Sequence, residues 1–229
     1  MKGSIWLLRH GEPVAETRGL CYGTLDIELS AEGVRQAKLA SVVLRSQPLA
    51  AIYSSPRRRC LAGARILARE RTCPVETIDA LGEIDFGEFE GQSYDEIAAE
   101  YPGLYREWME RPTEFHFPGG ESFEQMWERV TNTGRFLRDR HIGKSMVGES
   151  IAIVTHGGVI RILLAEALEL PRRNIFRIDQ CYGAINRIKY CDETAVVELV
   201  NLRPDSELSK LIVGAIEPAC QLPGFPDAG

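Results

Sequence analysis

The chain of 229 residues lacks three features that would each indicate a different class of protein. It has no uninterrupted apolar run of about 18 residues, which a membrane-spanning helix needs. Its six cysteines include no C-x-x-C pair and no Cys/His ligand spacing, which argues against a zinc site. Its longest basic run is Arg57-Arg58-Arg59 within a net charge of −6, which argues against a general nucleic-acid-binding surface.

The start of the chain turns polar too soon for a signal peptide. Together with the absences above, this predicts a cytoplasmic globular protein that binds neither membranes nor nucleic acids. A local basic pocket for an anionic small molecule is compatible with the composition. The sequence does not determine the oligomeric state, and a homodimer is compatible with it.

Short apolar segments alternate with amphipathic helical patterns, first up to residue 78 and again after residue 150. The order strand–helix–strand–helix–strand is typical of a parallel, doubly wound sheet. We therefore predict a three-layer α/β fold whose sheet is mostly parallel. The predicted strands are 5–8, 50–53, 74–78, 151–154, 176–178, 184–190 and 195–199, and the predicted sheet-covering helices are 34–44, 58–69 and 159–168.

Glycine and proline interrupt the alternation in the middle of the chain, where helices are expected at 94–101, 103–111 and 122–140. We predict that residues 92–148, approximately, form a helical insertion that caps the carboxyl edge of the sheet. One domain then spans residues 1–203, and residues 204–229 form a poorly ordered tail rich in proline.

Two histidines stand where predicted strands stop. His10 follows strand 5–8 directly after Arg9, and His156 follows strand 151–154. Arg59 lies just past strand 50–53, and Glu83 comes a short turn after strand 74–78. Because parallel strands share one carboxyl edge, these side chains can converge there although up to ~150 residues separate them.

A pocket of two arginines and two histidines favours an anion, and guanidinium groups bind phosphate oxygens in pairs. The positive charge disfavours imidazolium, so one histidine stays neutral near pH 7 and can attack phosphorus. Arg9, Arg59 and His156 can stabilise charge on the phosphoryl oxygens, and the Gly157 amide at a helix N-terminus can add a hydrogen bond. Glu83 would protonate the departing alkoxide and then activate water.

Each residue also has an ordinary explanation. A single histidine after a strand is more often a satisfied turn residue than a nucleophile, and Glu83 alone is most often a surface residue. His116 and His141 lie in the insertion without a partner motif, so we keep the ordinary explanation for both. The three strand ends Arg-His-Gly, Ser-Ser-Pro-x-x-Arg and Thr-His-Gly-Gly, in this order, are much harder to attribute to chance.

Five motifs between residue 4 and about residue 200 resemble, in order, those of the histidine phosphatase superfamily, also called phosphoglycerate mutase-like. The resemblance implies His10 as the phosphorylated nucleophile and Glu83 as the proton donor. It also implies Arg9, Arg59 and His156 as the phosphate pocket, with no metal and no organic cofactor. The motifs are LRHGE (8–12), YSSPRRR (53–59), GEIDFGEFEG (82–91), PGGES (118–122) and VTHGG (154–158).

Within the superfamily, segments 19–26 and 178–185 are similar to α-ribazole phosphatases, which act on an intermediate in building the lower ligand loop of cobalamin. This similarity implies a phosphatase for α-ribazole-5′-phosphate or a related small molecule. Tyr22, Gly23 and Thr24 are the implied substrate-binding residues, together with Gly157.

Three positions depart from the family pattern. Glu16 stands where many relatives have an asparagine that touches phosphate, and an acid there repels the ligand unless it turns away. Gly63 replaces a usual threonine, and Gly82 replaces an arginine that often precedes the glutamate. None of the three removes a catalytic group.

Three alternatives stay open. A phosphoglycerate mutase is disfavoured, because its branch typically carries a Trp-Asn pair and an Arg-His-Tyr run where this chain has Ala15-Glu16 and Ile84-Asp85-Phe86. A metal site using the two histidines with Glu12 and Glu83 is disfavoured by the adjacent arginines, which would repel a cation. A catalytically dead relative that binds a phosphorylated ligand is the third alternative.

Overall fold

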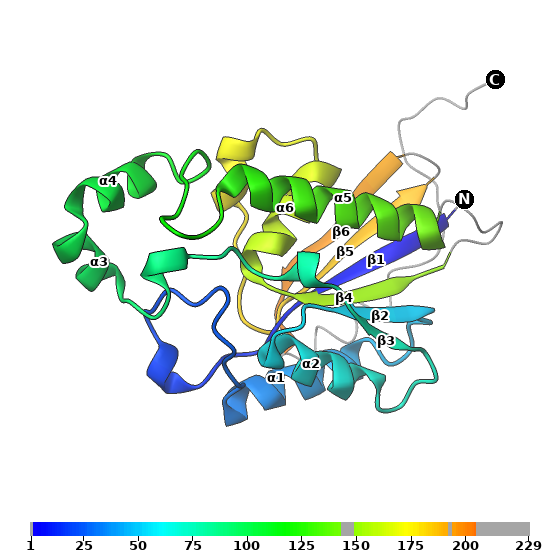
Figure 1. Cartoon of the computed structure of the whole chain (residues 1–229). Coiled ribbons are helices and arrows are strands. Elements are labelled where there is room, and N and C mark those ends of the chain that lie inside the picture. The colour runs from blue at the N-terminus through cyan, green and yellow to red at the C-terminus, as the bar shows by residue number, and fades with distance from the viewer. Residues whose placement is uncertain (1, 143–148, 192–193, 205–229) are drawn as a thin grey trace, which may run out of the picture.

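The structure is a computed structural model that describes residues 2–142, 149–191 and 194–204. Its centre is a six-stranded sheet in the order β3-β2-β4-β1-β5-β6 (Figure 1). The first four strands in sequence are mutually parallel, and β5 is antiparallel to both of its neighbours. The strands are β1 (Lys2–Arg9), β2 (Ala51–Ser54), β3 (Val75–Thr77), β4 (Ile151–Thr155), β5 (Ile185–Cys191) and β6 (Thr194–Leu202).

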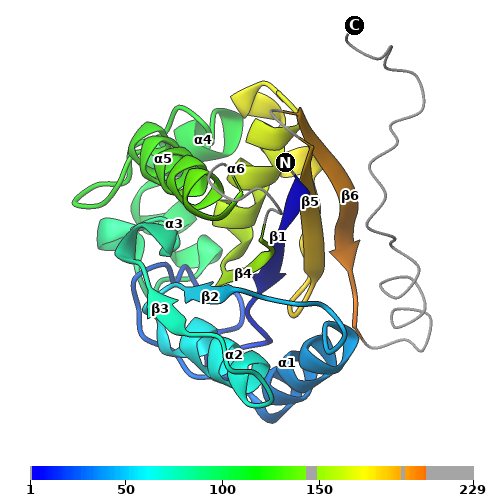
Figure 2. The same cartoon turned by 90° about the vertical axis from the view of Figure 1, so that its right-hand side faces the viewer.

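Helices cover both faces of this sheet, which confirms the predicted three-layer α/β fold. In Figure 2, α1 (Ala31–Val43) and α2 (Arg58–Ala68) lie on one face, and α5 (Phe123–His141) and α6 (Gly157–Ala167) lie on the other. Side chains point alternately to the two faces of a sheet, so β1 contributes to a hydrophobic core on each face. On β1, Trp6 and Leu8 pack on the α1–α2 side, whereas Ile5 and Leu7 join the core under α5 and α6.

The two helices α3 (Tyr94–Glu100) and α4 (Pro102–Glu110) lie beyond the carboxyl ends of the parallel strands (Figure 1). Ser93 begins α3 with a capping box that Glu96 completes, and Pro102 stands at the first turn of α4. An aromatic cluster ties this pair to the loops around it, because Trp108 packs against Phe115, Phe117 and Phe89. The helical insertion therefore covers the edge where the site residues lie.

Two expectations need correction. Residues 176–178 do not form a strand, because the 3₁₀ helix η4 (Arg172–Arg177) occupies this region and buries only Ile175. Phe176 is 54% exposed there, so the apolar side chains do not follow the period of two that a half-buried strand needs. Helix α5, expected in the cap, instead packs beside α6 on the sheet.

Short 3₁₀ helices connect several of these elements: η1 (Ala15–Thr17), η2 (Asp79–Leu81) and η3 (Gly87–Phe89). The predicted tail lies outside the described residues beyond Pro204. Across the described part of the chain, no helix combines the length and the apolar character that crossing a bilayer requires.

Candidate active site

A cavity of about 290 Å³ opens at the carboxyl edge of the sheet and contains all five side chains that the sequence assigned to catalysis. Arg9 and His10 come from the end of β1, and His156 comes from the end of β4. Arg59 lies in the first turn of α2, and Glu83 follows η2. The remaining lining residues are Gly19, Leu20, Cys21, Tyr22, Phe86, Tyr94 and Tyr182.

Backbone hydrogen bonds on both sides fix the position of His10. Its amide donates to the Thr155 carbonyl at 2.9 Å, and its carbonyl accepts from the Gly183 amide at 3.0 Å. The ring is 3% exposed, and its Nδ1 lies 2.8 Å from the Gly11 carbonyl oxygen. Because a carbonyl oxygen only accepts, Nδ1 must carry the hydrogen, and Nε2 of the neutral ring keeps its lone pair.

The glycine after His10 is required by a close approach of two backbone segments. A Cβ on Gly11 would lie 2.2 Å from the Gly33 carbonyl oxygen in the first turn of α1, and a Cβ on Gly33 would lie 2.1 Å from the Glu12 oxygen. Neither position tolerates a side chain without a backbone shift. The Ser30 hydroxyl caps this helix by accepting from the Gly33 amide at 3.0 Å.

Burial and positive charge together hold the pKa of His10 well below its usual value. Burial is the larger cause, followed by the Arg9 and Arg59 guanidiniums, and the bond to Gly11 opposes them. The pKa of His156 is likewise lowered well below its usual value by burial, by Arg59 and by the other histidine. Both rings are therefore neutral near pH 7.

The two rings face each other across the cavity. Their centroids lie 5.3 Å apart with an interplanar angle of 67°, an edge-to-face arrangement. Nε2 of His156 lies 2.8 Å from the Ser55 hydroxyl and 3.5 Å from the Cys60 sulfur. Burial raises the pKa of Cys60 to about 12, so this group stays a thiol and packs behind the histidine.

Two arginines, the buried Arg59 and the half-buried Arg9, keep part of their hydrogen-bonding capacity for a ligand. Arg59 is fully buried and donates to the carbonyls of Leu25 at 2.7 Å and Gly23 at 2.8 Å. Arg9 donates through one terminal nitrogen to the Gln180 carbonyl. Among the residues that the structure describes, neither arginine has a partner for its buried Nε. Because an unpaired buried donor is costly, this arrangement favours an anion.

Glu83 is held at the N-terminus of α6. One carboxylate oxygen accepts from the Gly158 amide at 3.0 Å and the other from the Ile84 amide at 3.2 Å. A Cβ on Gly158 would lie 2.3 Å from Oε1 of Glu83, the oxygen that accepts from the Ile84 amide. The second glycine of the Thr-His-Gly-Gly motif therefore makes room for the Glu83 carboxyl group at the start of α6.

The residues expected to bind substrate separate into two groups. Tyr22 lines the cavity. Gly23 and Thr24 do not, because their amides donate to the Glu90 carboxylate at 3.0 and 2.8 Å. This loop presents the carbonyls of Gly23 and Leu25 to Arg59 and so holds the arginine, and a substrate-binding role for Gly23 and Thr24 stays a prediction.

Gly157 lies beside the arginines, because a Cβ there would be 3.4 Å from Cζ of Arg9 and 3.1 Å from Arg161. Arg161 was missed by sequence reasoning. It lies one helical turn into α6 and donates to the Ile178 carbonyl at 2.8 Å. The spacing of Arg161 from Gly157, i to i+4 on one helix, could have pointed to it.

Glu16 does not repel a ligand in the pocket, because it is exposed on η1 and does not line the cavity. Ser55, Cys60 and Tyr182 are further site residues that the sequence did not reveal. Ser55 stood within the motif 53–59 and Tyr182 within the segment 178–185, so both motifs could have pointed to them.

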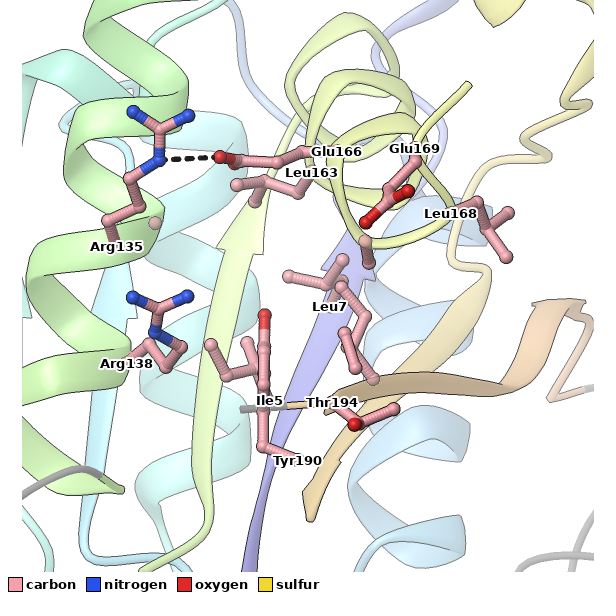
Figure 3. Close-up of a pocket in the computed structure, with 14 residues that line it drawn as sticks. Ile5, Leu7, Arg135, Arg138, Leu163, Glu166, Leu168, Glu169, Tyr190 and Thr194 are labelled. Carbon is pink, nitrogen blue, oxygen red and sulfur yellow. Dashed lines mark hydrogen bonds and ion pairs between the residues drawn. The ribbon is translucent and has the colours of Figure 1, made fainter. Parts of the chain in front are cut away.

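A second cavity, of about 540 Å³, lies between α5, α6 and strands β1, β5 and β6 (Figure 3). Arg135 on its rim pairs with Glu166 at 2.7 Å, as Figure 3 shows. Ile5 and Leu7 form part of its wall, and none of its lining residues is a histidine. It is therefore separate from the histidine pair. Among the described residues, no group of three or more His, Cys, Asp or Glu side chains is arranged to hold a metal ion.

Comparison with known proteins gives several similar phosphatases. The chain is 33% identical to phosphoserine phosphatase 1 of Hydrogenobacter thermophilus, over 71% of this chain and 74% of that protein. It is 29% identical to the adenosylcobalamin/alpha-ribazole phosphatase of Salmonella typhimurium, over 87% of this chain and 96% of that protein.

A similar solved structure is the alpha-ribazole phosphatase from Shigella flexneri, with a TM-score of 0.78 and 27% identity. The superposition covers 87% of this chain and 96% of that one. The family model described as the histidine phosphatase superfamily (branch 1) matches residues 5–203. The chain belongs to the histidine phosphatase superfamily.

Proposed function

We propose that this protein is a metal-independent phosphomonoesterase that forms a phosphohistidine at His10. The observation that carries the proposal is a buried, neutral His10 whose Nε2 keeps its lone pair, in a cavity with two arginines and a second histidine. A neutral imidazole nitrogen of this kind is a competent nucleophile toward phosphorus.

The reaction has two steps. In the first, Nε2 of His10 attacks phosphorus, the P–O bond to the alcohol breaks, and the Glu83 carboxylic acid gives its proton to the leaving oxygen. In the second, the Glu83 carboxylate takes a proton from water while the water oxygen attacks the phosphohistidine. The P–N bond breaks, inorganic phosphate leaves, and His10 is neutral again.

The surrounding groups stabilise charge on the transferred phosphoryl group. Arg9 and Arg59 offer their unpaired Nε–H groups, and His156 faces His10 across the cavity. Phosphoryl transfer needs mainly positioning and neutralisation of the equatorial oxygens, so a site of fixed donors is suited to it.

For the substrate, we favour α-ribazole-5′-phosphate or a related phosphorylated small molecule. Relatives with this activity in their names cover 87% of the chain. Tyr22, Phe86, Tyr94 and Tyr182 line the cavity, and aromatic walls suit a leaving group with a planar ring.

The nucleophile is tested by His10→Ala. Without the imidazole, turnover of p-nitrophenyl phosphate should fall at least ~10³-fold, because nucleophile and phosphate pocket act as a unit. Wild-type protein quenched during turnover should carry acid-labile phosphate that the variant lacks, and a chelator should leave wild-type activity intact. The control is His116→Ala in the insertion, where the histidine is exposed. Substantial turnover by His10→Ala would refute the proposal.

Glu83→Gln tests the proton donor. General acid catalysis typically contributes about 10²–10⁴-fold, so hydrolysis of an alkyl phosphate should fall within that range. Hydrolysis of p-nitrophenyl phosphate should fall less in its first step, because nitrophenolate leaves without a proton. The measurement is burst and steady-state kinetics on both substrates. Equal losses in the burst phase would show that Glu83 does not protonate the leaving group.

The pH dependence follows from the lowered pKa of His10. A depressed pKa keeps the imidazole neutral as the pH falls through 6.5, so the acid limb of kcat/KM should lie well below that pH. Rates should be corrected for the second ionisation of the phosphate ester, near pH ~6. Titration of the His10 ring by NMR gives an independent value, and a midpoint at or above 6.5 would contradict the burial and charge argument.

The substrate proposal is tested by a panel of α-ribazole-5′-phosphate, ribose 5-phosphate, phosphoserine and 3-phosphoglycerate. We expect the highest kcat/KM for α-ribazole-5′-phosphate, because only this ester offers a planar base to the aromatic walls. A preference for phosphoserine would move the assignment to amino-acid phosphates. Transfer of the phosphoryl group between positions of phosphoglycerate would indicate a mutase.

A further inference from the structure

Two tyrosines from distant parts of the chain meet at the active-site cavity. Tyr22 belongs to the loop between β1 and α1, and Tyr182 belongs to the loop between η4 and β5. Their hydroxyl oxygens lie 2.6 Å apart, the length of a strong O–H···O hydrogen bond. Both side chains line the cavity that contains His10.

Each tyrosine ring also contacts one arginine of the phosphate pocket. Cζ of Arg9 lies 4.1 Å from the centroid of Tyr182, and Cζ of Arg59 lies 5.3 Å from the centroid of Tyr22. Both are within the range of cation–π attraction. The hydroxyl bond therefore completes a continuous chain of contacts from one guanidinium to the other, which we call the tyrosine bridge.

The arginines need such support because their hydrogen bonds to the protein use only some of the N–H groups of each guanidinium. Arg59 is held through its two terminal nitrogens by backbone carbonyls, and Arg9 is held through one terminal nitrogen by the Gln180 carbonyl. The two like charges repel each other. Paired binding of phosphate oxygens depends on the orientation of the guanidinium plane, which a ring packed against it helps to fix.

The hydrogen bond between the two tyrosines persists at neutral pH. Burial, followed by the hydrogen bond to Tyr182, raises the pKa of Tyr22 above its usual value, so its hydroxyl stays protonated. The His10 ring lies 5.7 Å from the Tyr182 ring, which places the bridge next to the nucleophile.

We propose that Tyr22 and Tyr182 are positioning residues that act as one unit: their hydroxyl bond holds Arg9 and Arg59 at the spacing and tilt that grip a phosphoryl group. The proposal rests on the proposed phosphatase function for its kinetic consequences. Its effect on anion binding holds whether or not the protein turns substrate over.

The test compares Tyr22→Phe, Tyr182→Phe and the double variant, all of which keep the rings. Loss of one neutral hydrogen bond should weaken binding of inorganic phosphate, measured by calorimetry, by about fivefold. The kcat/KM for p-nitrophenyl phosphate should fall by a similar factor. The double variant should lose no more than either single variant, because one substitution already breaks the bridge. Tyr105→Phe is the matched control, since this ring packs on Trp108 in the insertion.

Three results would overturn the proposal. A double variant whose loss is the product of the single losses, about 25-fold, would show two independent roles. Unchanged phosphate binding with a higher KM for bulky esters only would show a gate for the leaving group. Unchanged values throughout would show no role. Each single variant breaks the bridge alone, so if one of them fails to fold by circular dichroism, the other still decides.

Failure of the proposed function would look different. Wild-type protein would then form no acid-labile phosphate on His10 during incubation with p-nitrophenyl phosphate, although it would bind inorganic phosphate. The tyrosine variants would still show the loss in phosphate affinity.

Discussion

Two buried imidazole rings, 5.3 Å apart, set the conditions for everything else at this site. A histidine taken out of water and placed beside guanidinium groups loses its proton readily, and both effects act on His10 and His156. The neutral form is the one that can attack phosphorus, so the burial that makes protonation costly also favours the proposed role of His10 as the nucleophile. The bond from Nδ1 of His10 to the Gly11 carbonyl then decides which nitrogen is free to react.

Holding these rings in place depends on backbone approaches that only glycine permits. Gly11 lets β1 meet the start of α1, and Gly158 lets the Glu83 carboxylate reach the start of α6. The proposed nucleophile and the proposed acid are consequently tied to the neighbouring strands β1 and β4. His10 follows β1, and Glu83 binds the start of α6, which follows β4. A parallel register between β1 and β4 keeps Arg9 opposite Thr155, so the two strand ends cannot slip relative to each other without moving the site.

The sequence predicted the part of the site that parallel strands deliver by topology. Arg9, His10 and His156 stand at strand ends, and that position fixes where they go. Contacts between loops could not be predicted: Tyr22 and Tyr182 are 160 positions apart, and nothing local in either recognised segment shows that their hydroxyl groups meet. The assignment of Gly23 and Thr24 to substrate binding stays a prediction, because motif position does not show which way an amide points, and both amides donate to Glu90. The expected strand at 176–178 was wrong because a short apolar run does not separate strand from 3₁₀ helix.

The charge distribution explains why an acidic protein is suited to phosphate esters. The net charge is −6, yet the pocket is locally basic. Burial and then the guanidiniums of Arg59, Arg9 and Arg57 lower the pKa of His156, and burial followed by Arg9 lowers the pKa of Arg161. These guanidiniums repel one another in the absence of a ligand, which costs the folded protein free energy. A phosphate dianion relieves that repulsion and satisfies the unpaired Nε donors of Arg9 and Arg59 at the same time. The pocket thus favours a doubly charged, oxygen-rich group over a neutral ligand before any contact with the leaving group is made.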